Sequence, residues 1–165
     1  NANLLHNKSK DMRSILDNLS FIMEDMSRNL RTGYDYHCIE NVHSGLSGDL
    51  DTALSDENCW GIAFEYQNGD IENINDQWVY FIDNDGKIWK STQGTYNNPP
   101  TNYVQLTPDN VVIDPVASSF TVTGAELGDE KQPFVTIKLF GSITYKDVIS
   151  PFSLQTSVSQ RTIDI

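Results

Sequence analysis

The sequence lacks the local patterns by which most enzymes bind phosphates, nucleotides or catalytic metals. It contains no phosphate-binding GxxxxGK[ST], no GxGxxG, no HExxH and no GxSxG. Its three histidines, His6, His37 and His43, stand in no recognisable catalytic pattern. Scattered carboxylates alone nominate no acid–base pair. We therefore expect a protein that is not an enzyme, holds no metal and needs no cofactor.

Long apolar runs and positive charge are also scarce. No run approaches the roughly 18 apolar residues of a membrane span, so we expect no transmembrane segment or signal peptide in these residues. Only 11 Lys and Arg stand against 23 Asp and Glu, which gives a net charge of −12. The excess lies after residue 31, where six basic residues meet nineteen acidic ones, a balance of −13. Such a body repels phosphates, which excludes nucleic acid as an expected partner, and its charge favours solubility.

What the sequence does contain is one long amphipathic helix near its start. Between residues 12 and 30, apolar residues recur at steps of one, three and four, the pattern of a helix with one buried stripe. The predicted core face of the helix consists of Met12, Ile15, Leu16, Leu19, Ile22, Met23, Met26 and Leu30. Phe21 alone lies off this stripe. The opposite face should be solvated, since it carries Arg13, Asp17, Glu24, Asp25 and Arg28.

This helix is expected to end before Gly33 and to overhang whatever it packs on. A helix over residues 5–32 would span about 42 Å, whereas a six-residue strand covers about 20 Å. Residues 6–11 carry no apolar stripe, so the N-terminal end should project past the sheet. No cap is visible at Asn1, and we expect the helix to continue into an upstream segment that this sequence does not include.

Residues 34–59 are predicted to form a long surface loop. They contain glycines, several serines and a cluster of acids, without a sustained period, and allow at most one helical turn at residues 50–54. Loops of this length are uncommon unless they are functional or tied down.

The two cysteines of the chain, Cys38 and Cys59, lie toward the ends of this segment and allow three interpretations. They could form a disulfide, join His37 and His43 in a zinc site, or be two unrelated buried thiols. The zinc spacing matches no common finger. A disulfide would explain how so long a loop stays ordered, and would stabilise the fold by about 3 kcal/mol in the chain-entropy model. We therefore predict a disulfide, which implies an oxidising, extracytoplasmic setting.

From residue 60 onward the apolar residues alternate with polar ones, which predicts strands. Expected strands or short extended pieces lie at residues 60–66, 78–82, 87–91, 104–106, 111–113, 120–122, 134–140 and 152–160. In the last of these, Phe152, Leu154 and Val158 should point inward while the intervening residues are polar, a pattern typical of antiparallel sheets. The predicted fold class is α+β. One long N-terminal helix (1–33) packs on an antiparallel sheet, possibly two small sheets, formed with a loop from residues 34–165, all in a single domain.

Two acidic segments deserve comparison with calcium sites. Asp83-Asn84-Asp85-Gly86 opens like a calcium loop, but the twelfth position is Gly94 rather than glutamate, so a hairpin turn is expected instead. The second segment carries Asp49, Asp51, Asp56 and Glu57 and is not expected to hold calcium.

Four stretches together resemble a known family. They are ILDNLSFIMEDMSRNLRTG (15–33), the Tyr36-His37-Cys38 that follows, PFVTIKLFG (133–141) and FSLQTSVSQR (152–161). In this order they look like minor type IV pilin-like proteins, close to the J-type pseudopilins of type II secretion. The resemblance implies a type IV pilin-like fold, in which the amphipathic half of a long helix packs on an antiparallel sheet. It also implies an upstream apolar helix half and a prepilin cleavage motif, neither of which is in these residues.

The resemblance implies a structural subunit, of the minor kind, of a type IV pilus or a type II secretion pseudopilus. Its expected partners are other pilin or pseudopilin subunits, met through the N-terminal helix, and the inner membrane before assembly. Its expected location is an extracytoplasmic filament, at the cell surface or in the periplasm. The alternative is a secreted or tip-located binding module, such as an adhesin with exposed aromatics at Tyr96 and Tyr103. An aromatic-lined hollow would favour that alternative.

Overall fold

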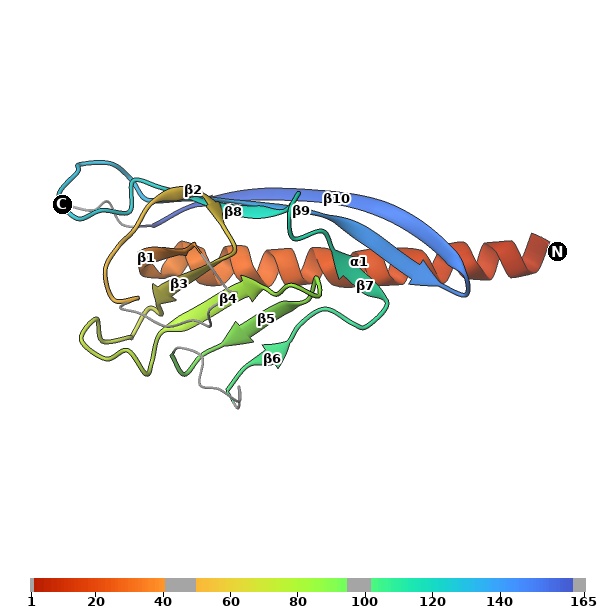
Figure 1. Cartoon of the computed structure of the whole chain (residues 1–165), viewed down its shortest axis with the longest axis horizontal. Helices are drawn as coiled ribbons and strands as arrows, with labels where there is room; N and C mark the ends of the chain where they lie inside the picture. Colours follow the sequence, from red (N-terminus) through yellow and green to blue (C-terminus); the bar gives the residue numbers. More distant parts are fainter. Residues whose placement is uncertain (1, 41–49, 95–101, 162–165) are drawn as a thin grey trace.

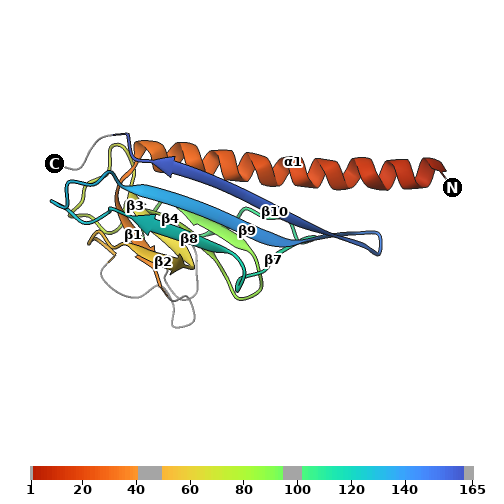
Figure 2. The ribbon, with the colours of Figure 1, turned by 90° about the horizontal axis from the view of Figure 1, so that it is seen from above.

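A single long helix, α1 (Ala2–Thr32), runs along two antiparallel sheets. The computed structural model describes residues 2–40, 50–94 and 102–161, and the side chains of the helix from residue 10 onward. The C-terminal part of α1 lies against the strands, while its N-terminal end projects past them (Figures 1 and 2). The observed architecture is therefore α+β, as the alternation of the strands and the single helical stripe predicted.

The first sheet has five strands in the order β1-β3-β4-β5-β6. Their bounds are β1 Tyr34–Ile39, β3 Gly61–Glu65, β4 Trp78–Ile82, β5 Ile88–Ser91 and β6 Val104–Gln105. Every pairing is antiparallel, so the chain from β3 to β6 forms a simple meander.

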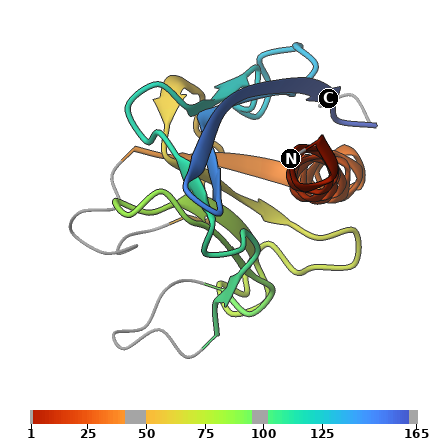
Figure 3. The same ribbon diagram turned by 90° about the vertical axis from the view of Figure 1, so that its right-hand side faces the viewer.

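The second sheet has the order β10-β9-β8-β2, and β7 also pairs with β9. Its strands are β2 Asp56–Cys59, β7 Val111–Ile113, β8 Ser119–Thr123, β9 Phe134–Tyr145 and β10 Val148–Ser159. The 12-residue strands β9 and β10 form a long hairpin that extends beside the helix (Figure 2). Viewed along α1, β10 curves over one side of the helix (Figure 3).

The main core fills the space between α1 and both sheets. Buried residues from each of the three layers form one cluster, for example Leu19 of α1, Phe64 of β3 and Ile137 of β9. On β9, Val135, Ile137 and Leu139 point into this core, and Leu154 and Val158 of β10 join them, with polar or exposed residues between. The helix stripe and the alternating strands therefore bury each other, because neither could keep its apolar side in water.

The first sheet is apolar on its other side as well. Ile39, Ala63, Val79 and Phe81 form a second, smaller cluster with Tyr103 and Leu50. Strands β3 and β4 therefore have almost no exposed residue, which is why their sequences show apolar residues at successive positions rather than alternation.

The turn between β4 and β5 is the hairpin that Asp83-Asn84-Asp85-Gly86 predicted. Gly86 has φ of 76°, a backbone conformation that L side chains rarely adopt. A side chain would not fit here either, because an added Cβ would lie 2.3 Å from the carbonyl oxygen of Ile113. The Gly86 carbonyl instead accepts a hydrogen bond from the Ile113 amide, which ties this turn to β7 of the second sheet.

The prediction of one long loop over residues 34–59 is wrong at both ends. Residues 34–39 form the buried strand β1, and residues 56–59 form β2. The suggested helical turn at residues 50–54 is also wrong, because Leu54 is extended and exchanges backbone hydrogen bonds with Tyr36 and Cys38. Residues 41–49 lie outside the described part of the chain.

Candidate assembly surface

The predicted core face of α1 is buried most deeply toward its C-terminal end. Leu19, Met26 and Leu30 have no exposed area, and Met23 is 6% exposed. Ile15, Leu16 and Ile22 are partly buried and pack against the same core, and Met12 is half-buried. The stripe is therefore covered by the sheets at one end of the helix and progressively less covered toward the other.

From residue 10 onward, where the helix side chains are described, its outward side carries one large apolar residue. Phe21 is 66% exposed, which agrees with its position off the stripe. Arg13 and Asp17 before it, and Glu24 and Arg28 after it, are all exposed as well. A lone aromatic among mixed charges on a rigid helix is the composition of a contact residue with a polar rim.

One residue of the face predicted to be solvated, Asp25, keeps 41% of its side chain exposed and also helps to hold the helix in place. Asp25 forms an ion pair with Lys90 of β5 at 3.2 Å, and its carboxylate also accepts a hydrogen bond from the Tyr80 hydroxyl. The Asn29 amide donates to that same hydroxyl at 2.8 Å. The Lys90 ammonium lies 4.6 Å from the centre of the Trp78 ring, a cation–π contact. This polar network joins α1 to the first sheet.

Further hydrogen bonds fix the C-terminal end of α1 to both sheets. The Tyr36 hydroxyl of β1 donates to the carbonyl of Leu30, and burial raises the pKa of this phenol well above its usual range. The backbone amide of Arg161, just after β10, donates to the carbonyl of Arg31 at 3.0 Å. The helix is thus anchored at one end, so that its free side is presented at a fixed angle.

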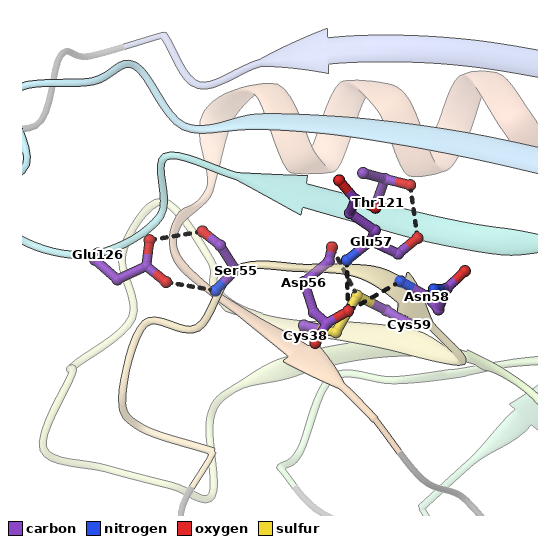
Figure 4. The surroundings of a disulfide bond; sticks show 8 residues. All are labelled: Cys38, Ser55, Asp56, Glu57, Asn58, Cys59, Thr121 and Glu126. Atoms are coloured by element: carbon purple, nitrogen blue, oxygen red, sulfur yellow. Dashed lines mark hydrogen bonds between the residues drawn. A yellow bond between two sulfur atoms is a disulfide. The ribbon is translucent and has the colours of Figure 1, made fainter.

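The two cysteines of the chain form a disulfide, as predicted. Cys38 and Cys59 are both buried, and their Cα atoms are 5.4 Å apart. Figure 4 shows the bond where the chain passes between the sheets, with Cys38 on β1 and Cys59 on β2. The zinc and free-thiol interpretations are therefore wrong, and the bond links the first sheet covalently to the second. His37 contacts the carbonyl of Thr52 instead, and His43 lies outside the described residues.

Glu126 holds the strand end next to the disulfide by accepting two hydrogen bonds from Ser55. The Ser55 amide donates at 2.8 Å and its hydroxyl at 2.7 Å (Figure 4). Partial burial alone would raise the pKa of Glu126, but the Ser55 donors outweigh it and hold the pKa below its usual value. Sequence reasoning missed this pair, because 71 residues separate its members and neither belongs to a motif.

The acidic segments compared with calcium sites show how their carboxylates are used in the described part of the chain. Within it, no three His, Cys, Asp or Glu side chains gather in a way that could hold a metal ion. The Asp83 carboxylate is occupied by the amides of Asp85 and Lys87 and by the Trp89 indole, as a hairpin turn requires. In the other acidic segment, Asp56 accepts from the amide of Glu57, and Asp49 lies outside the described residues.

Tyr103, one of the two aromatics expected to be exposed in a binding module, is buried. Tyr103 is only 9% exposed and packs edge-on against Phe81, with ring centres 5.0 Å apart. The prediction that it is exposed is wrong because the apolar outer side of β4 needs a cover. Tyr96 lies outside the described residues. Among the helical residues that the structure describes, none forms a stretch long and apolar enough to cross a membrane.

Comparison with known proteins identifies no relative of this chain. No protein-family model matches the chain. No curated protein and no solved structure matches it either. The arrangement of α1, the sheets and the disulfide therefore has to support any functional proposal by itself.

Proposed function

We propose that this chain is a structural subunit, of the minor kind, of an extracytoplasmic type IV pilus or type II secretion pseudopilus, assembled through α1. The observation that carries the proposal is the unequal use of this one helix. Its C-terminal part packs into the core, whereas its N-terminal end projects beyond the strands (Figures 1 and 2). Phe21 on the same helix is exposed.

A helix used in this way is suited to lateral assembly. Exposing a phenylalanine on a monomer's surface costs hydrophobic free energy that a neighbouring subunit could recover by covering it. The anchoring of α1 by Asp25, Asn29 and Leu30 keeps the orientation of the free part defined. Rigid presentation lowers the entropic cost of association.

The charge and the disulfide support the location and the role. A disulfide bond is compatible with an extracytoplasmic setting, where thiols are oxidised. In the proposed mechanism an upstream apolar segment lies in the inner membrane before assembly and then packs with neighbouring helices in the filament. The acidic body, with its balance of −13 after residue 31, stays in water on the outside.

A matched pair of substitutions in the full-length gene tests the proposal. Phe21→Asp places a charge on the proposed contact, and Val116→Asp places one at a residue that is 91% exposed but remote from α1 in sequence, after β7. We expect Phe21→Asp to abolish or shorten the filaments, or to block secretion, as deletion of the gene would. Val116→Asp should leave both intact.

Two results would overturn the proposal. One is normal assembly and secretion by the deletion strain or by Phe21→Asp, with the variant protein present at wild-type level. The other is a gene that encodes no apolar segment upstream of Asn1. In either case the secreted binding module would be the function to pursue next.

A further inference from the structure

A cluster of buried oxygen atoms lies where β3 ends and β4 begins. It involves Glu65, the last residue of β3, and Asp76 and Gln77, which directly precede β4. Glu65 and Gln77 have no exposed area, and Asp76 is half-buried. The three side chains come from the two ends of one loop and do not depend on the filament proposal.

Four oxygen atoms in this cluster are buried without a hydrogen-bond donor in the part of the chain that the structure describes. They are Oε1 and Oε2 of Glu65, Oδ1 of Asp76 and Oε1 of Gln77. Buried polar atoms are normally satisfied, so such a concentration indicates a missing partner. That partner must supply positive charge or donors, because all four atoms are acceptors.

The side chains are held in position by their other atoms. Nε2 of Gln77 donates to the carbonyl of Leu50 at 2.9 Å, which leaves Oε1 as its unused end. Oδ2 of Asp76 accepts from the amide of Asp70 at 3.0 Å, which leaves Oδ1. The turn backbone lies close to Glu65, since a Cβ added to Gly69 would be 2.4 Å from Oε2. The free oxygens are therefore preorganised rather than loose.

The electrostatics of the cluster are unbalanced. Burial, together with the negative charges of Asp76, Asp35 and Asp51, raises the pKa of Glu65 to about 7. The nearby Gln77 side chain offsets part of this rise, and the charged neighbours that shift it are acidic. Buried carboxylates of like charge are costly unless a cation or a proton compensates them.

We propose that Glu65, Asp76 and Gln77 bind a calcium ion. The two carboxylates match the charge of a divalent cation, and the amide oxygen is a further ligand of the kind that Ca²⁺ accepts. Ca²⁺ takes about six to eight oxygen ligands and tolerates irregular geometry, so water completes the set. The absence of nitrogen and sulfur donors among the three disfavours zinc. Because the third proposed ligand is an amide, this site is consistent with the lack of a cluster of three His, Cys, Asp or Glu side chains in the described residues.

The ion would clamp the loop between β3 and β4. It would bring Glu65 and Asp76 together without repulsion, and through Gln77 it would reach the backbone of Leu50. A bound ion would thus fix the segment that covers the outer side of the first sheet.

Calorimetric titration of the purified chain with calcium chloride, after treatment with EDTA and its removal, tests this site. We expect saturable one-site binding. The melting temperature should rise by about 5 to 10 °C when calcium is 100-fold above its Kd. Glu65→Gln and Asp76→Asn should each weaken binding at least tenfold. Glu72→Gln, which changes an exposed glutamate of the same loop, should bind as wild type.

The metal-free variants separate binding from folding. Metal-free Glu65→Gln should melt at or above the temperature of the metal-free wild type, because it removes an uncompensated buried charge. If this variant does not fold, Asp76→Asn at its half-buried position carries the test. The proposal would be overturned if the wild type bound no calcium. It would also be overturned if folded Glu65→Gln or Asp76→Asn bound calcium as tightly as the control Glu72→Gln. Equally tight binding of magnesium would overturn the assignment to calcium.

Discussion

At the scale of single residues, position on α1 determines whether an apolar side chain stabilises the monomer. Leu19 has no exposed area and Phe21, two residues later, is 66% exposed. A step of two residues rotates a side chain by more than half a turn around a helix, so the two lie on nearly opposite sides. Chemically similar residues can therefore have different roles within one turn.

Truncating Leu19 should destabilise the fold strongly. Leu19→Ala removes buried methyl groups and leaves a cavity, so the free energy of unfolding should fall by about 2 to 5 kcal/mol in urea. Phe21→Ala is the matched control and should change it by no more than about 0.5 kcal/mol, as exposed positions do. A Leu19→Ala loss below about half a kcal/mol would mean that the stripe is an external contact instead.

The hydrogen bonds from Ser55 to Glu126 should give a pH-dependent contribution to stability. The pKa of Glu126 is lowered in the folded chain, so its contribution is present above the pKa of an unfolded glutamate, about 4.3, and is lost as pH falls through the lower folded value. Glu126→Gln should therefore unfold at lower urea than wild type at pH 7, and the difference should shrink between pH 5 and pH 3. Glu130→Gln, at an exposed position of the same loop, should show no such pH-dependent difference.

The residues that could be predicted from sequence are those whose environment follows from a local period. The stripe from Leu19 to Leu30 and the exposure of Phe21 follow from 3.6-residue spacing. Asp25, Glu65 and Glu126 could not be assigned in this way. Their partners, such as Lys90, are distant in sequence, and a carboxylate among many in an acidic chain carries no local signal.

At the scale of elements, the disulfide is the covalent link between the two sheets. It joins β1 to β2 over a sequence separation of 21 residues. Strand β2 is short, and three of its four residues are exposed, so little apolar burial holds it in the sheet. The disulfide therefore mainly holds β2 in the second sheet and fixes the point at which the chain continues into β3.

Reducing the bond should lower the free energy of unfolding by about 3 kcal/mol in the chain-entropy model. Urea unfolding with and without reductant measures this loss. Intact-mass measurement after alkylation in denaturant shows first that the bond is present, since the unreduced protein should gain no alkyl group. Two alkylated cysteines in the unreduced protein would contradict the disulfide. An equal urea midpoint for the oxidised and reduced protein would show that the disulfide does not stabilise the fold.

Two strands were missed from the sequence: β2, which is short and mostly exposed, and β1, which is almost entirely buried. In β9 and β10 one side is wet, so apolar and polar residues alternate visibly. In β1 the residues Tyr36 and Cys38 point into the main core, and Ile39 into the second cluster. This strand also contains a bulge between Tyr34 and His37, with Asp35 at φ of 55°, which breaks the regular period. Its sequence accordingly resembles a loop.

At the scale of the whole molecule, net charge is unevenly divided between the helix and the rest of the chain. The helical segment up to residue 31 is nearly neutral, with five basic and four acidic residues, whereas the rest carries −13. Copies of the acidic body repel one another, whereas α1 offers a surface of mixed sign with the exposed Phe21. Association through the helix is therefore compatible with a body that stays dispersed in water.

The isolated 165-residue chain should consequently be a monomer in solution. The described outer side of α1 exposes one large apolar residue, Phe21, which buries too little area for a stable dimer without further contacts. Sedimentation velocity at increasing protein concentration should give a constant mass near 18.6 kDa at physiological salt. Raising the salt screens the repulsion between acidic bodies and so tests whether charge alone keeps the copies apart. A dimer that persists in Phe21→Asp would place the association outside the helix. A dimer that this substitution abolishes would show that the helix surface suffices for pairing by itself.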